Sequence, residues 1–381
     1  MLAPIVLLAG VWLGGHPQLL PGPVADALVD REGRVVAEAI AKVDATYIEE
    51  VDEGQLADAA IAGIVRDLDD EYSSYLTASE YDRFQEATHG RFQGVGITVR
   101  GIKAGLQVQG VVRGSPAARA GIRRGDVIVA AGGRSLAGRP TDVATALVKG
   151  PAGSEVRLRL RRDGRTLTKR VRRATVSVPV VEREARRAAG QRVAHITLSA
   201  FTQGAHEQLG DAIGEARERG AEGIVLDLRG NGGGLVKEAQ RVASEFVEDG
   251  EIVTTRGRSG PDRRLVAVGS PAAGDLPVVV LVDGATASAA EIVTGALQDH
   301  DRATVVGRTT FGKGVFQTLL PLDNGGALNL TTGRYFTPDG RNLAGDGIAP
   351  DVRAADDADT PRDEALRAAL ETLGRKLPRA G

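Results

Sequence analysis

The stretch "LPVVVLVDGATASAAEIVTGALQDH", residues 276–300, changes its pattern halfway along. Its first part is a run of apolar, mostly β-branched residues, which is typical of a strand buried on both faces of a sheet. After a turn of small residues, apolar side chains return at three- and four-residue intervals, and this spacing predicts a helix over 289–299. A buried strand followed directly by a helix is the building unit of an α/β layer.

The same unit recurs on both sides of this stretch. Helical spacing occurs at 205–219 and 235–247. Apolar runs suited to buried strands occur at "RVAHITL" (192–198), "GIVLDLRG" (223–230) and "ATVVG" (303–307). From about residue 190 onward the chain is therefore predicted to form an α/β core.

Two other patterns precede this core, and one follows it. Residues 34–89 have the apolar spacing of helices. The segment from about 90 to 178 predicts short strands broken by Gly and Asp, with one helix in "RPTDVATALVKG" (139–150). Residues 357–381 are charged and Ala-rich, which predicts a surface helix. The helical ends of the chain are candidates for pairing subunits in a homo-oligomer.

Composition excludes several classes of site. The chain has 381 residues, a length that suggests two or three domains, and its formal net charge of −2 gives no electrostatic case for nucleic acid. It has no cysteine, which excludes disulfides, thiolate metal sites and cysteine nucleophiles. Its five histidines are scattered without paired-ligand spacing, so no metal site is predicted.

The N-terminus suggests export. "MLAPIVLLAGVWLGG" has the length of the apolar region of a signal sequence and is shorter than the roughly 20 residues of a full membrane span. No Asp, Glu, Lys or Arg occurs in the first 25 residues, so the usual basic start is absent. We expect residues 1–27 to be a cleaved signal sequence or a retained membrane anchor. The protein is then extracytoplasmic, in the bacterial cell envelope or periplasm, either secreted or membrane-anchored.

Ser288 allows two interpretations. Ser288 and Glu291 fit the capping box S-x-x-E, in which the serine caps the helix and contributes ~1 kcal/mol. Alternatively, Ser288 is a nucleophile at the positive end of a helix dipole, with the nearby N–H of Ala289 available to an oxyanion. A nucleophilic serine needs a base, and His300 lies about 18 Å along the same helix, too far for a hydrogen bond.

Lys313 is a candidate base. The chain has only seven lysines among its 48 Lys and Arg residues, and this one stands between two glycines in "TTFGKGVFQT" (309–318). Desolvation lets a buried lysine lose its proton near neutral pH, whereas arginine stays protonated. The alternative is an exposed turn lysine, and His195 or His206 could also serve as the base. A nucleotide-binding P-loop is disfavoured, because Gly314 stands where Ser or Thr is needed and a strand is expected to follow.

A glycine-rich turn forms a third candidate site. "DLRGNGGGLVKEAQ" (227–240) joins a strand to a helix, and backbone N–H groups at such a turn can bind an anion or a developing oxyanion. A dinucleotide fingerprint is disfavoured, because Leu235 occupies the third glycine position. A simple tight connection is the alternative interpretation.

Together these motifs resemble those of the carboxyl-terminal processing peptidases, also called tail-specific proteases. These are exported serine proteases with a Ser-Lys dyad and an inserted PDZ domain. The resemblance covers nearly all of residues 35–352. The matching segments are "LDDEYSSYL" (68–76), "FQGVGITV" (92–99), "GSPAARAGIRRGDVIVAAGGRSL" (114–136), "VLDLRGNGGGLV" (225–236), "ATASAAEIVTGALQD" (285–299), "RTTFGKGVFQT" (308–318) and "YFTPDGRNLAGDGIAPDV" (335–352).

The resemblance implies an α/β fold with a crotonase-like protease core, an inserted PDZ-type β-module and an N-terminal helical region. The expected segments are a signal or anchor (1–27), the helical region (28–90), the PDZ domain (91–178), the protease core (179–356) and a tail helix (357–381). Ala290 stands where the family has a second serine, and we expect activity to survive this difference.

The resemblance also assigns roles to residues. Ser288 corresponds to the nucleophile and Lys313 to the general base. Gln317 corresponds to a glutamine that orients the lysine, and on a strand positions 313 and 317 would point to the same side. The oxyanion hole would be formed by the N–H groups of Ala289 and of Gly234, with Gly233 as the alternative. No cofactor or metal is implied.

The implied substrates are protein or peptide chains with free, often apolar C-termini. In a PDZ domain such a tail adds as a strand at a sheet edge, and its carboxylate binds N–H groups of a glycine loop, here Gly94, Val95, Gly96 and Ile97. A purely structural β-module is the alternative for this segment. Two other functions remain open: a scaffold that binds tails with an inactive protease core, and a crotonase-like acyl-CoA enzyme. The N-terminal segment is expected to contact membrane if it is retained.

Overall fold

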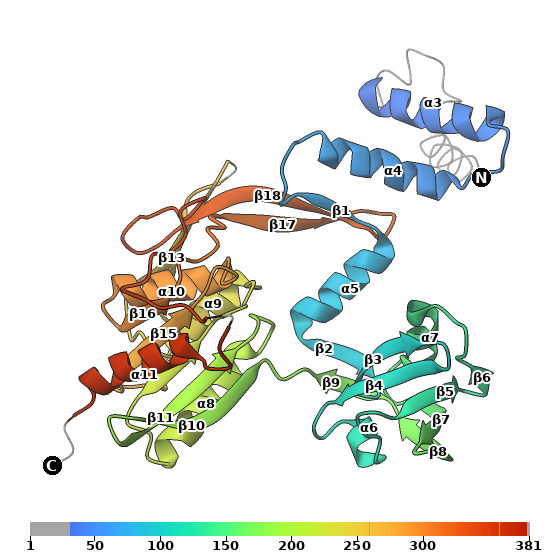
Figure 1. Cartoon of the computed structure of the whole chain (residues 1–381). Helices are drawn as coiled ribbons and strands as arrows, with labels where there is room; N and C mark the ends of the chain where they lie inside the picture. Colours follow the sequence, from blue (N-terminus) through green and yellow to red (C-terminus); the bar gives the residue numbers. More distant parts are fainter. Residues whose placement is uncertain (1–30, 259, 358, 379–381) are drawn as a thin grey trace, which may run out of the picture. The chain divides into compact units, whose positions relative to one another are not determined.

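The computed structural model describes residues 31–258, 260–357 and 359–378 (Figure 1). These residues form two compact units. The smaller contains the described part of Met1–Tyr81 with Gln317–Thr331, and the larger contains Asp82–Phe316 with the described part of Thr332–Gly381. Within the described ranges, no helix is both long and apolar enough to pass through a bilayer. The predicted signal or anchor, 1–27, lies outside the described residues.

A six-stranded sheet forms the centre of the α/β core in the larger unit. In spatial order its strands are β10 (Val181–Ala188), β11 (Gln191–Leu198), β12 (Ile224–Asp227), β15 (Val278–Val282), β16 (Ala303–Gly307) and β19 (Val352–Arg353). β10 runs antiparallel to β11, and all other neighbours are parallel. Each apolar run that predicted a buried strand forms one, so the predicted α/β core is confirmed.

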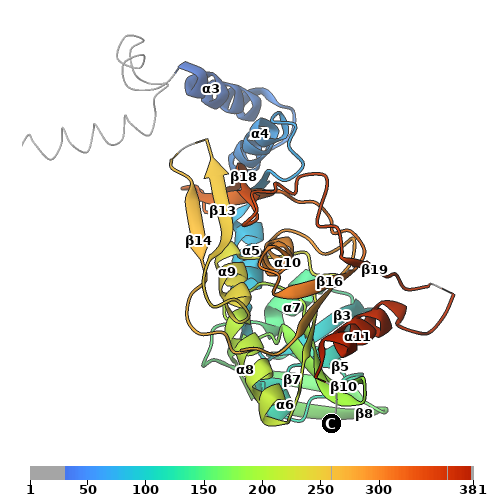
Figure 2. The same cartoon turned by 90° about the vertical axis from the view of Figure 1, so that its left-hand side faces the viewer.

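Helices cover both faces of this sheet. α8 (Ala205–Glu218), α9 (Val236–Ser244) and α10 (Ala289–Asp299) share a hydrophobic cluster with Val278, Val280 and Val282 of β15. α11 (Glu364–Lys376) shares a second cluster with Val279 and Leu281. Neighbouring residues of a strand point to opposite faces, so β15 is buried from both sides. In Figure 2, β16 lies between α10 and α11.

The predicted tail helix forms, and its charged side is exposed as expected, but its other side is part of the core. The small and apolar side chains of Ala365, Leu366, Ala369 and Leu373 are buried against the sheet. Alanine contributes little apolar area. In the sequence, the alanine-rich buried side of this helix therefore resembles the side of an exposed helix. α11 therefore completes the core by packing against the face of the sheet opposite α8, α9 and α10.

An ion-pair network fastens the start of α11 to the sheet. Arg229, just after β12, donates to the carboxylates of Asp227 at 2.7 Å and of Asp363 at 2.9 Å, and Asp363 is the N-cap of α11. Burial raises the pKa of Asp227, but hydrogen bonds from His195 and Arg229 outweigh it and hold this pKa below the ordinary 3.8. Burial likewise raises the pKa of Asp363, and the bond from Arg229 helps to bring it below 3.8.

The larger unit also contains the predicted β-module. Its sheet has the order β3-β4-β5-β7-β8, with β6 paired to β5, and β2 pairs separately with β9. The elements are β2 (Arg91–Gly94), β3 (Ile97–Ile102), β4 (Gly105–Val111), α6 (Pro116–Arg119), β5 (Val127–Ala131), β6 (Arg134–Ser135), α7 (Thr141–Val148), β7 (Glu155–Arg162), β8 (Arg165–Arg172) and β9 (Ala174–Ser177). The short strands and the helix in 139–150 are confirmed, but the module has a second, short helix, α6, which was not predicted.

The alternating sequence of β7 explains its position in this sheet. Val156, Leu158 and Leu160 are buried in the core of the module, while Arg157 and Arg159 between them are exposed. This is the pattern of a strand with one face in a core and one in water. β3, at the end of the strand order, has an outer edge without a partner strand among the described residues.

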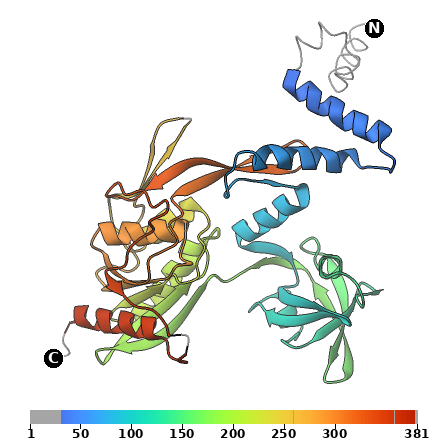
Figure 3. The same ribbon diagram turned by 45° about the horizontal axis from the view of Figure 1, so that its top comes forward.

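The smaller unit combines two helices with short strands (Figure 3). They are α3 (Arg31–Thr46), α4 (Glu53–Arg66), β1 (Ser74–Leu76) and most of β17 (Val315–Pro321), and α5 (Ala78–His89) begins there. β18 (Ala327–Phe336) pairs with β1 and β17, and its later residues pair with β13 (Glu251–Gly257), which pairs with β14 (Arg263–Val266).

The helical expectation for 34–89 is confirmed except at β1. Asp69 adopts a left-handed conformation with φ 50°, which ends the helical segment. The Asp70 carboxylate then accepts hydrogen bonds from the N–H of Tyr72 and the hydroxyl of Ser73. This turn sends residues 74–76 alongside β18, so they form a strand.

The network at Arg229 generates a stability prediction. In Arg229→Met, the carboxylates of Asp227, Asp356 and Asp363 all lose this partner, and we expect the free energy of unfolding at pH 7 to fall by about 2–4 kcal/mol in urea titrations. Because the folded pKa of Asp227 and Asp363 is lowered, their contribution is present above about pH 4 and is lost as the pH falls through the folded values. The difference between the variant and the wild type should therefore shrink toward pH 3.

Arg367→Met is the matched control, because Arg367 is an exposed arginine on α11 that forms an i,i+4 surface pair with Glu371. Equal losses for the two variants at pH 7 would contradict an anchoring role for Arg229.

Candidate active site

Ser288 lies at the junction of β15 and α10 in a strained backbone conformation. It is the N-cap of α10, and its φ of 58° and ψ of −118° place it in the left-handed half of conformational space. A non-glycine residue adopts such angles only where surrounding contacts enforce them, and strain of this kind collects at functional sites. A sharp strand-to-helix turn that exposes a serine is typical of a nucleophile in α/β enzymes.

The turn before Ser288 is fixed by two polar side chains. One carboxylate oxygen of Asp283 accepts hydrogen bonds at 3.0 Å from the N–H groups of Ala285 and Thr286. It also accepts one at 3.0 Å from the N–H of Gly230 in the glycine-rich turn. The fully buried Thr286 donates its hydroxyl to the carbonyl of Leu228 at 2.8 Å. The turn after β15 and the turn after β12 are thus bound to each other.

Asn231 holds the glycine-rich turn in shape. Its side chain is fully buried, donates to the carbonyl of Leu198 at 2.7 Å and accepts from the N–H of Gly233 at 2.8 Å. Its backbone carbonyl accepts from the N–H of Ala287 at 2.9 Å. The loop therefore packs directly against the residue that precedes Ser288.

Gly233 is a glycine because of this close approach. Its φ is 98°, and a Cβ atom there would lie 2.8 Å from the Cβ of Ser288 and 2.9 Å from the backbone nitrogen of Ala289. Both distances are shorter than non-bonded contacts allow. The glycine-rich turn and the N-terminus of α10 therefore lie side by side.

Two backbone donors at this junction are available to a ligand. Within the described part of the chain, the N–H groups of Ala289 and Gly234 have no hydrogen-bond acceptor. The N–H of Gly233 differs, because it donates to the side chain of Asn231. Of the two glycines predicted for an oxyanion hole, Gly234 has the available donor.

A buried carboxylate joins the Ser288 turn to the Lys313 segment. Glu291, in the first turn of α10, is fully buried, and its Oε2 accepts from the N–H of Ser288 at 2.8 Å and the N–H of Lys313 at 3.0 Å. Its Oε1 accepts from the hydroxyl of Thr310 at 2.6 Å and the N–H of Gly312 at 2.7 Å. The backbones of Ser288 and Lys313 are therefore bonded to the same oxygen atom.

This role of Glu291 was missed from the sequence. The capping box identified its contact with Ser288, and the structure confirms that half of the motif. The N–H of Glu291 itself donates to the backbone carbonyl of Ser288 at 2.8 Å. This N–H in the first turn of the helix therefore has a backbone acceptor. The S-x-x-E spacing gives no indication of the other partners of Glu291, which lie about twenty residues downstream.

The glycines beside Lys313 let its backbone pass close to the backbone of residues 344–347. A Cβ on Gly314 would lie 2.3 Å from the backbone nitrogen of Ala344, and one on Gly312 would lie 3.0 Å from that of Gly347. Lys313 is half-buried in an extended segment, and β17 begins only at Val315. A strand follows, as predicted, which is incompatible with a P-loop.

Gln317 lies on β17 in the smaller unit, where its amide donates to the hydroxyl of Thr331 at 3.1 Å. The argument that 313 and 317 share one side of a strand fails, because the strand starts after Lys313. Its role beside the lysine stays a prediction.

His195 does not belong to the Ser288 junction. It is buried on β11 and its Nε2 contacts the carboxylate of Asp227 at 2.9 Å. By strand alternation it shares a face with Val193 and Val225, which pack with α11, whereas α10 packs on the opposite face. His206 instead contacts Glu238 of α9 through Nδ1 at 2.8 Å. The described residues contain no cluster of potential ligands that could hold a metal.

The predicted tail-binding loop lies between β2 and β3. Gly96 has a φ of 84°, and a Cβ there would lie 2.3 Å from the Cβ of Ser115, so only glycine fits. Among the described residues, the N–H groups of Val95 and Gly96 have no acceptor. They precede Ile97 at the start of the edge strand β3, and Gly94 ends β2.

Three family models match successive parts of the chain. The N-terminal domain of the activating protease CtpB matches residues 26–80, the PDZ domain matches 107–162, and peptidase family S41 matches 192–354.

Individual relatives extend this similarity over most of the chain. A probable CtpA-like serine protease of Staphylococcus aureus (strain COL) is 35% identical over 338 residues, which are 88% of this chain and 66% of the relative. The corresponding protein of Staphylococcus haemolyticus (strain JCSC1435) is 35% identical over 312 residues, or 81% of this chain and 62% of the relative.

A solved structure agrees with these relatives. The photosystem II D1 C-terminal processing protease is 29% identical, with a TM-score of 0.52 over 91% of this chain and 98% of that one. The resemblance deduced from the motifs is confirmed, and the chain belongs to the carboxyl-terminal processing peptidases of peptidase family S41.

Proposed function

We propose that this protein is an exported serine endopeptidase that cleaves protein chains recognised by their C-terminal tails. One observation carries the proposal: a single buried oxygen of Glu291 binds the N–H groups of both Ser288 and Lys313. A serine in a strained turn is thereby kept next to a half-buried lysine. This arrangement supports a Ser-Lys dyad, in which the lysine activates the serine.

The proposed reaction proceeds in two halves. Neutral Lys313 accepts the proton of the Ser288 hydroxyl as its oxygen attacks the scissile carbonyl, and Gln317 orients the lysine. The N–H groups of Ala289 and Gly234 stabilise the oxyanion that forms. The protonated lysine then gives its proton to the leaving amine, and an acyl-enzyme remains. In the second half, water attacks the ester, Lys313 accepts its proton and returns one to Ser288, and the new carboxyl end departs.

Tail recognition is assigned to the PDZ domain. The outer edge of β3 can accept an extended peptide as an added strand, and the N–H groups of Val95 and Gly96 can bind its terminal carboxylate. The domain match and the unpaired edge support this role. Substrates are then proteins or peptides with free C-termini, in the bacterial cell envelope or periplasm to which the apolar N-terminus is expected to direct the chain.

The two competing functions are weaker. A tail-binding scaffold with an inactive core requires no strained serine and no shared carboxylate at 288 and 313. Tail binding without turnover would establish that function. An acyl-CoA enzyme would use the same kind of N–H pair, but the match to a PDZ domain favours a peptide ligand over a cofactor.

The identity of the base is tested with Lys313→Arg. We expect kcat/KM on a disordered protein with a free apolar C-terminus to fall about 10³-fold, because arginine retains a positive charge and cannot accept the proton. Thermal unfolding should be unchanged. Lys237→Arg, an exposed lysine of α9, is the matched control and should retain activity. If Lys313→Arg cleaves at the wild-type rate, Lys313 is not the general base and the proposed Ser-Lys dyad is disproved.

The role of the shared carboxylate is tested with Glu291→Gln. The substitution keeps the shape but points an amide N–H at backbone N–H groups, which should cost about 1–3 kcal/mol of stability. We also expect kcat to fall at least tenfold while KM changes little, because the serine and lysine lose their common anchor. Glu248→Gln, on an exposed glutamate, serves as the control. A destabilised variant with unchanged kcat would show that Glu291 supports the fold alone.

Recognition of the tail is tested with two forms of one peptide substrate, with a free or an amidated C-terminus. Amidation removes the charge that the Val95 and Gly96 N–H groups would bind, so kcat/KM should fall about tenfold or more. A peptide with one internal Glu→Gln change controls for net charge. Equal rates for the free and amidated peptides would disprove carboxylate recognition.

A further inference from the structure

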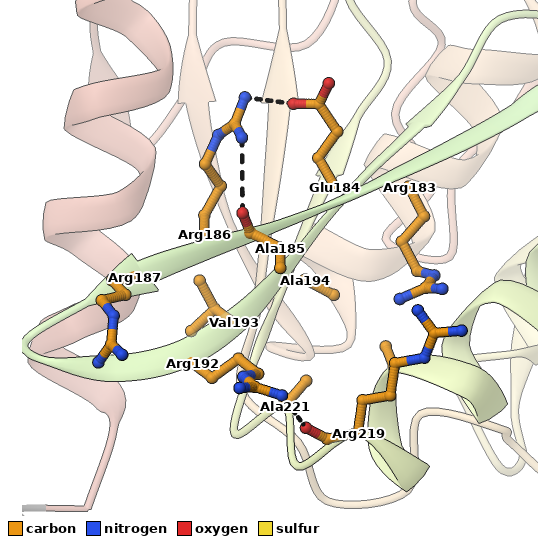
Figure 4. A pocket seen from close by; sticks show the side chains of 11 residues that line it. Arg183, Glu184, Ala185, Arg186, Arg187, Arg192, Val193, Ala194, Arg219 and Ala221 are labelled. Atoms are coloured by element: carbon orange, nitrogen blue, oxygen red, sulfur yellow. Dashed lines mark hydrogen bonds and ion pairs between the residues drawn. The ribbon is translucent and has the colours of Figure 1, made fainter.

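A pocket of about 550 Å³ lies away from Ser288, on the hairpin of β10 and β11 beside the end of α8. Figure 4 shows the arginine side chains that surround it. No residue of this pocket belongs to the dyad, the oxyanion hole or the tail-binding loop. It therefore requires an explanation of its own.

Small side chains create this pocket. Ala185 and Ala194 lie directly opposite each other on the two strands, and Ala216 and Ala221 close the floor from the end of α8 and the residues after it. A larger residue at any of these positions would reduce the space. The floor is thus apolar and shallow, while the longer side chains stand at the rim.

The rim is strongly positive. Arg183, Arg187 and Arg192 share a face with Ala185 and Ala194 by strand alternation, and Arg219 joins them from the end of α8. Arg186 lies on the other face and pairs with Glu184. Among the described residues, one further carboxylate, that of Glu215, pairs with these arginines, at 2.8 Å from Arg183 and 3.5 Å from Arg219. Five guanidinium groups and two carboxylates leave a surplus of three positive charges.

Two of these arginines have no carboxylate partner within the described residues. Arg187 donates to the carbonyl of Gly190 at 2.8 Å, and Arg192 donates to the carbonyl of Arg219 at 2.7 Å. They also lie directly opposite each other in the hairpin, and like charges in that position destabilise an antiparallel pair. A bound anion would relieve this repulsion.

We propose that this pocket binds a ligand with two phosphate groups. Guanidinium groups bind phosphate oxygens through paired, charge-assisted hydrogen bonds. A soluble diphosphate carries about three negative charges near pH 7, which matches the surplus, and the two phosphodiesters of a lipid headgroup carry about two, whereas one carboxylate would neutralise a single arginine. The alanine floor leaves room for an uncharged part of the ligand. Such a ligand is either a soluble diphosphate or a lipid headgroup that carries two phosphates.

The full-length chain is titrated with sodium pyrophosphate by calorimetry and, separately, sedimented with phosphatidylcholine vesicles that contain or lack cardiolipin. Saturable pyrophosphate binding would support a soluble ligand. Binding to cardiolipin vesicles alone would support a headgroup. In either case Arg187→Ala/Arg192→Ala should weaken binding at least tenfold, and its thermal unfolding without ligand should match or exceed that of the wild type.

Arg157→Ala/Arg159→Ala is the matched control, since it removes the same charge from the exposed face of β7. This variant should bind like the wild type. Equal weakening in both double variants would overturn the proposal, because only general electrostatic attraction would then remain. Failure of pyrophosphate and of cardiolipin vesicles to bind would also overturn it. Neither measurement depends on proteolysis, so the result is independent of the proposed peptidase activity.

Discussion

The carboxylate of Glu291 is the constraint on which the candidate active site depends. A fully buried charge is tolerated only when hydrogen bonds replace its water, and each oxygen of this carboxylate receives at least two. Any movement of the 288 turn or the 310–313 segment would leave part of that charge unsatisfied. The strained backbone of Ser288 persists because these bonds, together with those of Asn231 and Thr286, determine its position from several sides.

The sheet and the loops contribute differently to this arrangement. The parallel strands β12 and β15 end at the same edge of the sheet, so their following turns meet there without long connections. Asp283, Thr286 and Asn231 then join one turn to the other through backbone groups. The hydrophobic core fixes where the strands end, and the polar side chains of the turns fix the geometry within the resulting space.

Features determined by local pattern could be predicted from the sequence, while those determined by distant partners could not. The buried strands and α10 follow from runs of apolar residues and from helical spacing. The Ser288 turn, the glycine-rich turn and the lysine segment were found through their unusual composition. The contacts of Glu291 with Thr310 and Gly312 have no signature in spacing, because the fold alone brings them together. Similarly, the alanine-rich stripe of α11 gave no sign of its burial, and β1 depends on β18, some 250 residues away.

The shared carboxylate has an evolutionary consequence. Glu291 holds the backbone N–H groups of Ser288 and Lys313 and makes no demand on either side chain. The backbone arrangement of the site therefore does not depend on the side chains at positions 288 and 313. One codon change at either position removes the proposed nucleophile or the proposed base and keeps both backbone N–H groups that bind Glu291. A lineage with this architecture can therefore lose catalysis in one step while these backbone bonds remain.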